Sequence, residues 1–261
     1  MTQQSPHSLV ALVTGAASGI GRATVERLVA QDCGVIAVDR DRDPFGWVTA
    51  SGLAESVEIV VGDVTHEQTN VDAAAAALAR FGRLDAAVFN AGIPMRGDLL
   101  DLPMEEFDRA IAVNVRAVVL GIRAVVPQMR LAGVGRIVVT ASTSGIGGDP
   151  DMWAYNTSKG AVINLVRATA VDLGPDNITV NAVCPGPTET EMTSRARALP
   201  ERYEQLRRTI PLQRWGRAAE IASVIAFLVS ADASFVNGAV IPVDGGITAN
   251  TGQFMPRNTR A

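Results

Sequence analysis

Residues that build metal centres and disulfide frameworks are scarce in this sequence, which has two cysteines and two histidines among 261 residues. Cys33 and Cys184 are too few and too far apart for a disulfide framework or a cysteine-based zinc site, which favours a reducing, cytoplasmic location. His7 and His66 are too few for most histidine-ligated metal sites and for a serine–histidine–aspartate triad. We therefore expect no metal ion, and a general base other than histidine.

Basic runs and long apolar runs are also missing. The net charge of -4 and the isoelectric point near 5.3 argue against a broad nucleic-acid-binding surface. No stretch of about 18 uninterrupted apolar residues is present, and the polar N-terminal arm, residues 1–8, lacks the apolar core of a secretory signal. We therefore expect a soluble protein with no nucleic-acid or membrane partner, and a small molecule as its ligand.

The remaining composition suits one α/β domain that spans residues 1–261. Hydrophobic residues make up 48% of the chain and aromatic residues 5%, so the core is expected to consist mainly of Ala, Val, Ile and Leu. Short β-branched apolar runs alternate with longer helical patterns, which indicates βαβ units around a parallel sheet covered on both faces, a doubly wound Rossmann-type fold. The predicted strands are residues 9–13, 35–38, 57–61, 86–89, 136–140, 179–183 and 239–243, and the predicted helices are residues 20–31, 71–81, 104–129, 153–173 and 218–230.

Two segments interrupt this alternation. Residues 41–56 contain a proline and two glycines, so any helix there is expected to be short. Residues 187–216 combine several prolines with a charged, helix-prone middle. Because this insert follows a strand at the carboxyl edge of a parallel sheet, we interpret it as a substrate loop that covers a site. Residues 248–261 are expected to form a C-terminal tail.

The first predicted strand runs directly into a glycine-rich turn and then a helix. Glycines let the chain turn tightly and let the backbone approach a pyrophosphate, which the free N–H groups and the dipole of the helix N-terminus attract. The spacing Gly-x-x-x-Gly-x-Gly differs from the commoner Gly-x-Gly-x-x-Gly, and such turns also serve packing alone, but the position in the first βα turn favours nucleotide binding. The expected phosphate-binding residues are Gly15, Ser18, Gly19, Ile20 and Gly21.

Asp39 ends the second predicted strand. A carboxylate there can accept hydrogen bonds from the ribose hydroxyls of an adenosine and repel a 2′-phosphate, which favours NAD over NADP. Arg40 follows and can serve a phosphate, but Ser18 leaves the glycine turn without a basic residue to help it. Asp63 and Val64, after the third predicted strand, lie where they can reach the adenine edge, and an ordinary strand-end cap is the other interpretation of Asp63.

Tyr155 and Lys159 stand four residues apart in a predicted helix. Positions i and i+4 share a helix face, so a phenol and an ammonium can converge on one site. A tyrosine with a pKa of about 10 is a poor base at neutral pH, and a nearby positive charge favours its phenolate form. The pair is therefore a candidate for moving a proton on and off a hydroxyl, although an exposed pair on a solvated helix has the same pattern.

Taken together, the motifs resemble those of the short-chain dehydrogenase/reductase family in its NAD-preferring form. The resemblance spans residues 9–247 and includes the glycine turn, Asn90-Ala91-Gly92, Tyr155/Lys159 and Pro185-Gly186. It implies a seven-stranded parallel sheet and a nicotinamide dinucleotide cofactor. Phe89 departs from the asparagine that is usual at this position, which we expect to alter packing rather than chemistry.

The resemblance also implies catalytic roles for four residues. Tyr155 resembles the general acid/base of the family, and Lys159 resembles the residue that lowers the pKa of the tyrosine and bonds the nicotinamide ribose. Ser142, 13 positions before Tyr155, resembles the residue that holds the substrate oxygen. A turn-capping role is also open for Ser142, and Ser144 is a competing candidate. Asn114 resembles the residue that holds a relay water near the lysine.

The cofactor-binding set implied by the resemblance extends beyond the glycine turn. One motif supports the sheet and the adenosine ribose, and a segment past the sixth strand approaches the nicotinamide and bonds its carboxamide through two threonines. These residues are Asn90, Ala91, Gly92, Pro185, Gly186, Thr188 and Thr190, together with Tyr155 and Lys159. Residues 244–246 resemble a C-terminal signature with a mainly structural role.

These features predict an NAD-dependent oxidoreductase that transfers hydride between the nicotinamide and a secondary alcohol or ketone. Apolar residues in the loops around the site favour an apolar or cyclic substrate, although several of them can instead pack beneath the loops. The expected substrate-binding residues are Ser142, Tyr155, Met95, Met152, Trp153 and Met192. Three arginines, Arg96, Arg195 and Arg197, leave an anionic substrate open.

Two other functions remain open for a chain with these motifs. A 3-oxoacyl-carrier-protein reductase usually goes with NADPH and a basic nucleotide site, which Asp39 disfavours. A regulatory protein can keep a dinucleotide-binding fold without catalysis, which the presence of all four catalytic residue types disfavours. The resemblance also implies a homotetramer or homodimer, with the helices at residues 104–129 and 153–173 as the candidate interface.

Overall fold

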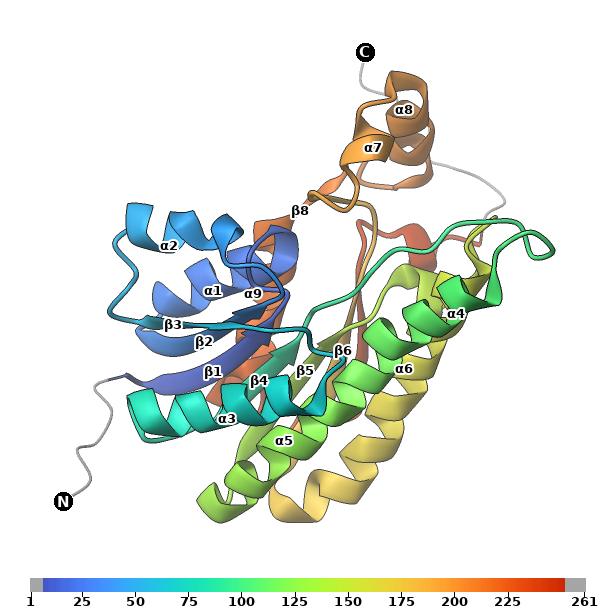
Figure 1. Ribbon diagram of the computed structural model, residues 1–261. Helices are drawn as coiled ribbons and strands as arrows, with labels where there is room; N and C mark the ends of the chain where they lie inside the picture. The colour runs from blue at the N-terminus through green and yellow to red at the C-terminus, as the bar shows by residue number, and fades with distance from the viewer. Residues whose placement is uncertain (1–6, 252–261) are drawn as a thin grey trace.

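Seven strands form one parallel sheet in the order β3-β2-β1-β4-β5-β6-β9 (Figure 1). The computed structural model describes residues 7–251, so most of the predicted N-terminal arm and residues 252–261 of the predicted tail lie outside the described residues. The strands are β1 (Leu9–Thr14), β2 (Cys33–Asp39), β3 (Val57–Val61), β4 (Ala86–Phe89), β5 (Gly135–Thr140), β6 (Ile178–Pro185) and β9 (Val240–Val243). The predicted single-domain, doubly wound α/β fold is confirmed.

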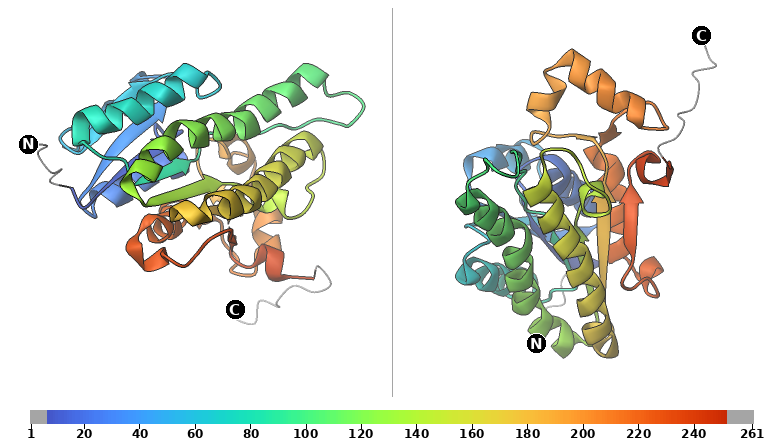
Figure 2. Two further views of the ribbon diagram at one scale, coloured as in Figure 1. Left: turned by 90° about the horizontal axis from the view of Figure 1, so that it is seen from below. Right: turned by 90° about the vertical axis from the view of Figure 1, so that its right-hand side faces the viewer.

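Helices cover both faces of this sheet (Figure 2). Alternate side chains of each strand point to opposite faces, and β1 therefore supplies Val10 and Leu12 to one core and Ala11 and Val13 to the other. The first core lies beneath α3 (Glu67–Phe81), α5 (Ala117–Ala132) and α6 (Trp153–Leu173), and the second beneath α1 (Gly19–Val29) and α9 (Ala218–Val229). Burial on both sides explains why the strand sequences are almost continuously apolar.

Strand and helix boundaries follow the predictions within a few residues. β6 runs past its predicted end because Cys184 and Pro185 pair with Pro242 and Val243 of β9. The helix α6 matches its predicted range, whereas α3 begins one turn before the predicted residue 71. The first turn of α3 is polar, so a prediction based on the spacing of apolar residues misses the start of this helix.

The helix predicted at residues 104–129 contains an irregular turn. α4 (Met104–Ile111) passes through a π-helical turn, η2 (Ala112–Arg116), into α5. Such turns occur often at functional sites, and Asn114 lies in this one. By length and composition the whole stretch, Met104–Ala132, is apolar enough to cross a membrane. Its most apolar 18 residues have a mean hydropathy of 1.7, and half of these residues are buried inside the protein. A core helix packed on a sheet, as here, meets the same criteria.

The first irregular segment, residues 41–56, forms only short helices, as predicted. They are η1 (Asp43–Phe45) and α2 (Gly46–Ala50). Phe45 and Trp47 are buried and hold the segment on the sheet, and the guanidinium of Arg22 lies 4.9 Å from the centre of the Trp47 ring. The remaining short 3-10 turns are η3 (Thr143–Gly145), η4 (Gly174–Asp176), η5 (Ala231–Ala233) and η6 (Ile247–Ala249).

The second irregular segment, residues 187–216, projects above the carboxyl ends of the strands (Figure 1). We call it the lid. It contains β7 (Thr188–Glu189), α7 (Ser194–Arg197) and α8 (Pro200–Thr209), and it ends in β8 (Gly216–Arg217), which pairs with β7. The predicted charged, helical middle is present.

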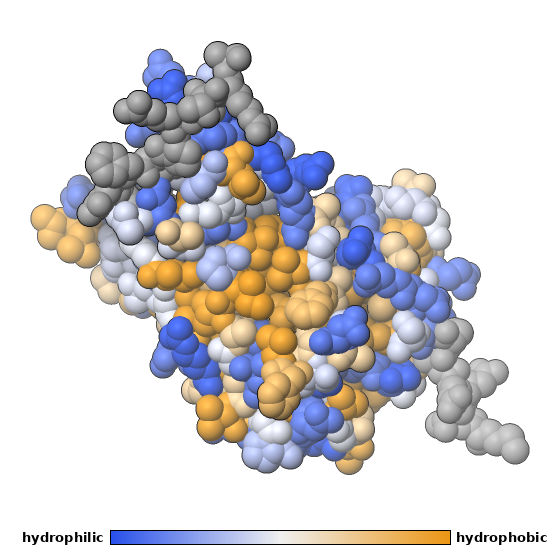
Figure 3. Space-filling model, turned by 180° about the vertical axis from the view of Figure 1, so that it is seen from behind, coloured by the Kyte–Doolittle hydropathy of each residue, from blue (hydrophilic) through white to orange (hydrophobic). Residues whose placement is uncertain are grey.

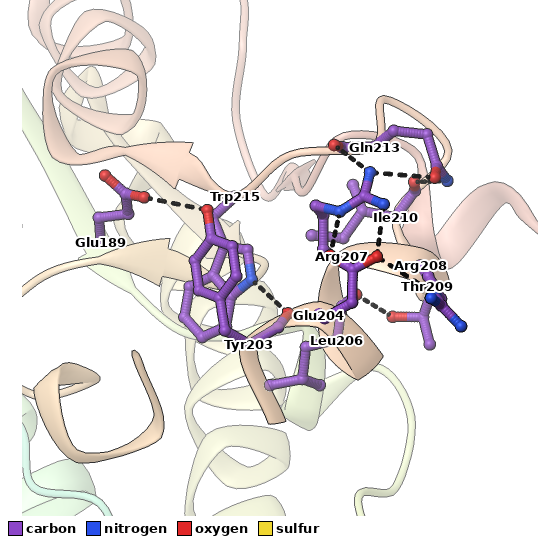
Figure 4. Close-up of polar contacts among 10 residues, drawn as sticks. All are labelled: Glu189, Tyr203, Glu204, Leu206, Arg207, Arg208, Thr209, Ile210, Gln213 and Trp215. Carbon is purple, nitrogen blue, oxygen red and sulfur yellow. Dashed lines mark hydrogen bonds and ion pairs between the residues drawn. The ribbon is translucent and has the colours of Figure 1, made fainter. Parts of the chain in front are cut away.

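Contacts within the lid hold it as a folded unit (Figure 4). The rings of Tyr203 and Trp215 stack with centroids 5.1 Å apart, and Trp215 Nε1 donates to the carbonyl oxygen of Tyr203 at 3.3 Å. Tyr203 Oη donates to Glu189 Oε1 at 3.4 Å, which ties α8 to β7. Hydrogen bonds from Arg207 and Arg208 lower the pKa of Glu204 to about 2. The lid is therefore ordered by its own side chains.

Candidate functional site

The glycine turn leaves room only for backbone at three positions. Gly15 and Gly19 have φ angles of 64° and 51°, a region that side chains rarely adopt. A Cβ atom on Gly21 would collide with the carbonyl oxygen of Gly15, and a Cβ atom on Gly15 would lie 2.9 Å from Cα of Ala91. Ser18 precedes α1 and is exposed, while Ile20 packs partly into the core. The N-terminus of α1 therefore faces an open backbone cradle, which fits a pyrophosphate.

Asn90 and Ala91 hold this cradle from the neighbouring strand end. The N–H groups of Asn90 and Ala91 donate to Oγ1 of Thr14 at 3.0 and 3.1 Å. Asn90 Nδ2 donates to the carbonyl oxygens of Thr14 and Gly15, both at 3.2 Å. The motif thus fixes the start of the turn from the side, and Gly92 continues the chain toward Lys159.

Asp39 closes the other side of the turn. Its Oδ2 accepts the N–H of Ala17 at 2.9 Å, and its Oδ1 accepts the N–H of Arg40 at 2.7 Å. The guanidinium of Arg40 points instead to Asp41, with Nε 3.6 Å from Oδ2. A carboxylate therefore stands at the end of β2, and the arginine beside it is engaged elsewhere.

Asp63 and Val64 follow β3 at the same edge of the sheet. Asp63 Oδ1 accepts both the N–H and the hydroxyl of Thr65, at 2.8 and 2.7 Å. Burial works against ionisation, but these two hydrogen bonds outweigh it and hold the pKa of Asp63 below its ordinary value. Val64 packs against the core, and its carbonyl oxygen accepts Asn70 Nδ2. Asp63 is thus a strand-end cap.

The segment after β6 reaches over the glycine turn. A Cβ atom on Gly19 would lie 3.2 Å from the side chain of Thr190, so the lid touches the turn there. Gly186 permits close packing against Asp244, and Thr188 Oγ1 donates to the carbonyl oxygen of Gly186 at 2.9 Å. Pro185 ends β6 beneath them. A cavity of about 480 Å³ lies at this nucleotide end, between the starts of α1 and α9 and the lid, rather than at Tyr155.

The side chains of Tyr155 and Lys159 converge as predicted from their spacing. Lys159 Nζ lies 5.8 Å from the centre of the Tyr155 ring and donates to the carbonyl oxygen of Thr140 at 2.8 Å. Lys159 is only 4% exposed. Lys159 is therefore buried beside the end of β5 and Tyr155 is half-buried, so the interpretation as an exposed surface pair is wrong.

The pKa values of this pair differ from the sequence-based expectation. Burial raises the pKa of Tyr155 to about 12; a hydrogen bond with Ser142 opposes this rise and the charge of Asp149 adds to it. Burial lowers the pKa of Lys159 to about 8. In the cofactor-free protein burial therefore has the largest effect on the pKa of Tyr155, and the lowering expected beside Lys159 is not the net result.

Asn114 is 1% exposed and is held by the loop after β4. Its Nδ2 donates to the carbonyl oxygen of Ile93 and to Oγ of Ser158, both at 3.0 Å, and its Oδ1 accepts the N–H of Ile93 at 2.8 Å. A Cβ atom on Gly92 would lie 3.2 Å from Asn114 Oδ1 and 3.4 Å from Lys159 Nζ. The absence of a side chain at Gly92 therefore lets the Asn114 amide and the Lys159 ammonium lie close to the same point of the backbone.

Ser142 and Ser144 share the short turn η3. Ser142 Oγ accepts the N–H of Ser144 at 3.1 Å, so it caps the turn, and its hydroxyl lies close enough to the phenol to oppose the rise in the Tyr155 pKa. Gly145 lets this turn pack against the backbone of Lys159, because a Cβ atom there would lie 2.6 Å from the Lys159 carbonyl. Ser144 Oγ instead donates to Asp149. The turn-capping interpretation of Ser142 is thus confirmed and leaves its substrate role a prediction, while the competing Ser144 is bound to another partner.

The four predicted apolar substrate residues divide into two groups. Met95 is 6% exposed and Trp153 stacks on Phe107 with centroids 5.3 Å apart, so both pack beneath the loops in a small cluster that includes Tyr155. Met152 precedes α6 and is half-buried, and Met192 on the lid is 49% exposed. The cluster provides an apolar wall next to the tyrosine.

The three arginines that suggested an anionic substrate lie in different parts of the structure. Arg96 lies 3.8 Å from Asp151, which offsets its charge. Arg195 and Arg197 are exposed on α7, and Arg197 lines the cavity at the nucleotide end. They do not form one anion site.

Three residues that position the site were not identified from the sequence. Thr14 receives two backbone N–H groups from the Asn90 motif, Ser158 joins Asn114 to the carbonyl oxygen of Tyr155, and Asp149 binds Ser144. The adjacency of Ser158 to Lys159 was the available signal for one of them. Among residues 7–251, no group of three or more His, Cys, Asp or Glu side chains is placed to hold a metal ion.

Comparisons with known proteins agree with this arrangement. The family model described as enoyl-(acyl carrier protein) reductase matches residues 15–248. The chain is 42% identical over 248 residues to the 2-(R)-hydroxypropyl-CoM dehydrogenase of Xanthobacter autotrophicus, covering 93% of this chain and 99% of that protein. A crystal structure of a short-chain type dehydrogenase/reductase from Mycobacterium marinum superimposes with a TM-score of 0.88 at 33% identity, covering 94% of this chain and 98% of the other. The chain belongs to the short-chain dehydrogenase/reductase family.

Membership of the short-chain dehydrogenase/reductase family gives the chain its reaction class. It is an oxidoreductase that acts on CH–OH groups with a nicotinamide dinucleotide. The chain is also 38% identical over 248 residues to the meso-2,3-butanediol dehydrogenase of Serratia marcescens, covering 94% of this chain and 96% of that protein. The alternative of a non-catalytic regulator is not supported.

Proposed function

We propose that this oxidoreductase uses NAD to interconvert a secondary alcohol and its ketone, with an apolar or cyclic substrate. The observation that carries the proposal is the convergence of Ser142, Tyr155 and Lys159 at the carboxyl edge of the sheet, beside a glycine turn suited to a dinucleotide. The related dehydrogenases act, by their names, on 2-(R)-hydroxypropyl-CoM and on meso-2,3-butanediol, which supports an alcohol substrate.

Proton transfer is assigned to Tyr155. Its phenolic oxygen takes the hydroxyl proton of the alcohol during oxidation and returns it during reduction. Ser142, whose hydroxyl lies next to the phenol, is assigned to hold the substrate oxygen. Lys159 bonds the nicotinamide ribose and favours the phenolate, and Asn114 holds a water beside Lys159. Because burial keeps the phenol protonated in the cofactor-free protein, activation of Tyr155 belongs to the complex.

The dinucleotide is held by backbone and by the ends of three strands. The nicotinamide, when bound, accepts or donates the hydride. The residues assigned to it are Gly15, Ser18, Gly19, Ile20, Gly21, Asp39, Asp63, Val64, Asn90, Ala91, Gly92, Pro185, Gly186, Thr188 and Thr190. Among them, Gly21 lets the turn pack against the backbone of Gly15, and Gly19 lets it pack against Thr190, so the turn stays tight enough to bring backbone N–H groups to a pyrophosphate. The lid, residues 187–216, is assigned as the substrate loop.

The proposed substrate class is tested by NADH formation from a panel of neutral secondary alcohols, cyclic alcohols and vicinal diols. We expect turnover with at least one alcohol, because the wall next to Tyr155 is apolar. A 3-oxoacyl thioester with NADPH is included to test the reductase alternative. Turnover of the thioester with NADPH and of no alcohol with NAD contradicts the proposal.

We further propose a homotetramer built from two apolar faces. On α6, the predicted interface residues Ala161 and Ala168 are exposed, as is Val171 at 77%, whereas Val162 belongs to the core of its own subunit. A second apolar area is visible on the back of the molecule (Figure 3). Phe227 of α9 is 45% exposed, and Phe235, in the segment before β9, is fully exposed. Two unlike faces are what a tetramer with dihedral symmetry needs.

Mass measurement by light scattering after gel filtration tests the assembly. We expect the wild type at the mass of four chains and Val171→Glu at the mass of two, because the charge disrupts only the α6 face. A monomeric wild type at micromolar concentration contradicts the proposal.

A further inference from the structure

One carboxylate close to Tyr155 has no role in the proposed proton transfer. Asp149 lies in the loop of residues 146–152, between η3 and α6. Its Oδ2 accepts the hydroxyl of Ser144 at 2.5 Å, and Ser144 is 8% exposed. An exposed loop carboxylate is thus held on a buried hydroxyl.

Asp149 also contacts the first turn of the helix that carries Tyr155. Its carbonyl oxygen accepts Asn156 Nδ2 at 3.1 Å and the N–H of Met152 at 3.3 Å. On the other side, Ser144 donates its N–H to Ser142 Oγ at 3.1 Å. Asp149 therefore joins the turn that carries Ser142 to the helix that carries Tyr155.

Few other charges act on the Tyr155 phenol. From α6 itself comes Lys159, and β6 brings the Cys184 thiol next to Lys159, where burial raises the pKa of the thiol to about 11 and keeps it uncharged. The loop after β4 places the uncharged Ile93 and Met95 against Tyr155, and the Arg96 on that loop lies near Asp151 at its exposed end.

Two further elements pack on α6 near the phenol and bring no additional charge to it. α4 contributes Phe107 and Ala110 to the cluster around Tyr155. Its charged residues are Glu105, Glu106, Asp108 and Arg109; Glu106 and Arg109 pair with each other, and Glu105 and Asp108 are exposed. The π-helical turn contributes the uncharged Asn114. Asp149 is thus the negative group that acts on the phenol, and it adds to the rise in the Tyr155 pKa.

We propose that Asp149 is a positioning residue for this reaction: through Ser144 it sets the turn that bears Ser142, and it places a negative charge near the phenol of Tyr155. This inference rests on the proposed function of Tyr155 as the acid/base. Its sign follows from electrostatics, since a negative neighbour disfavours the phenolate. Loss of the charge therefore makes the phenolate available at lower pH.

The test uses Asp149→Asn, which keeps an oxygen for Ser144 and removes only the charge. In the pH profile of kcat/KM for alcohol oxidation, we expect the acid limb to move to lower pH by on the order of half a unit to one unit. The matched control is Asp172→Asn, which removes an exposed carboxylate at the far end of α6 and leaves the profile in place. An equal shift in both variants overturns the proposal.

Ser144→Ala tests the hydrogen bond between Ser144 and Asp149 while leaving the Asp149 side chain in place. It releases the carboxylate while leaving it ionised, so we expect a fall in kcat of about three- to tenfold and a displacement of the acid limb in the same direction. This second variant keeps the proposal testable if Asp149→Asn does not fold. A wild-type pH profile in Ser144→Ala overturns it.

A spectroscopic measurement separates failure of this inference from failure of the proposed function. The chain has two tyrosines, so ¹³Cζ-tyrosine labelling of the cofactor-free protein yields two NMR signals, and Tyr155→Phe assigns them. We expect the Tyr155 signal to begin its titration at lower pH in Asp149→Asn than in the wild type. Superimposed titrations, within about 0.2 pH unit, overturn the role of Asp149, whatever the enzyme oxidises.

Discussion

Tyr155→Phe is expected to lower kcat for alcohol oxidation by at least about 10²-fold and by up to ~10⁴-fold. The substitution removes one oxygen atom and leaves the ring in the apolar cluster with Met95 and Trp153. Without that oxygen, the acid/base assigned beside Ser142 is missing and the substrate proton has no acceptor there. The measurement is steady-state NADH formation with the best alcohol of the panel.

Cofactor binding separates loss of chemistry from loss of structure in this variant. The glycine turn, Asn90 and Asp39 are assigned to the adenosine and pyrophosphate, away from the phenol, so the dissociation constant for NAD is expected to stay within about threefold of wild type. Calorimetric titration measures it. Substantial dehydrogenase activity in Tyr155→Phe, with NAD bound normally, would remove Tyr155 from its assigned role.

Asp39→Asn is expected to reduce the preference for NAD over NADP by about tenfold or more, equivalent to ~1.4 kcal/mol. In the wild type we expect NAD to be favoured by at least about tenfold in kcat/KM, because the Asp39 charge repels a 2′-phosphate. The asparagine keeps an oxygen for the N–H of Ala17, so the glycine turn remains closed. The ratio of kcat/KM values with the two cofactors measures the change.

Asp41→Asn is the matched control for this cofactor prediction. It removes the same charge two residues further on, where Asp41 faces Arg40. Freed from that partner, Arg40 gains access to a phosphate, but the Asp39 carboxylate still blocks the ribose position, so NAD is expected to remain the better cofactor. A wild type that prefers NADP contradicts the assignment of Asp39, as does an Asp39→Asn variant with an unchanged ratio.

Local patterns predicted most of the architecture because the sheet is buried on both faces. An apolar, β-branched strand such as β3 needs no knowledge of its neighbours to be recognised, and α6 shows both of its ends in sequence. Where the prediction was inaccurate, polar residues concealed the element. The first turn of α3 begins with Glu67, which suits the helix dipole, yet adds nothing to an apolar pattern.

The candidate site residues were predicted on different grounds and in different detail. Spacing alone placed Tyr155 and Lys159 on one helix face, and a resemblance supplied Ser142 and Asn114. The π-helical turn that carries Asn114 was not predicted. One wider turn within a long helix changes the spacing of the apolar residues too little to be recognised in the sequence. Met95 and Trp153 have the same composition whether they line a pocket or pack beneath a loop, so only their contacts distinguish the two.

The amino-acid sequence alone determined the fold class, the glycine turn and the chemical types at the site, because periodicity and backbone freedom are local properties. The tertiary structure decided how these groups act on one another. Burial, which depends on every packed neighbour, raises the pKa of Tyr155 and lowers that of Lys159. Asp149 acquires its relation to Ser142 and Tyr155 only when the turn, the loop and the helix meet, since no spacing along the chain encodes that contact.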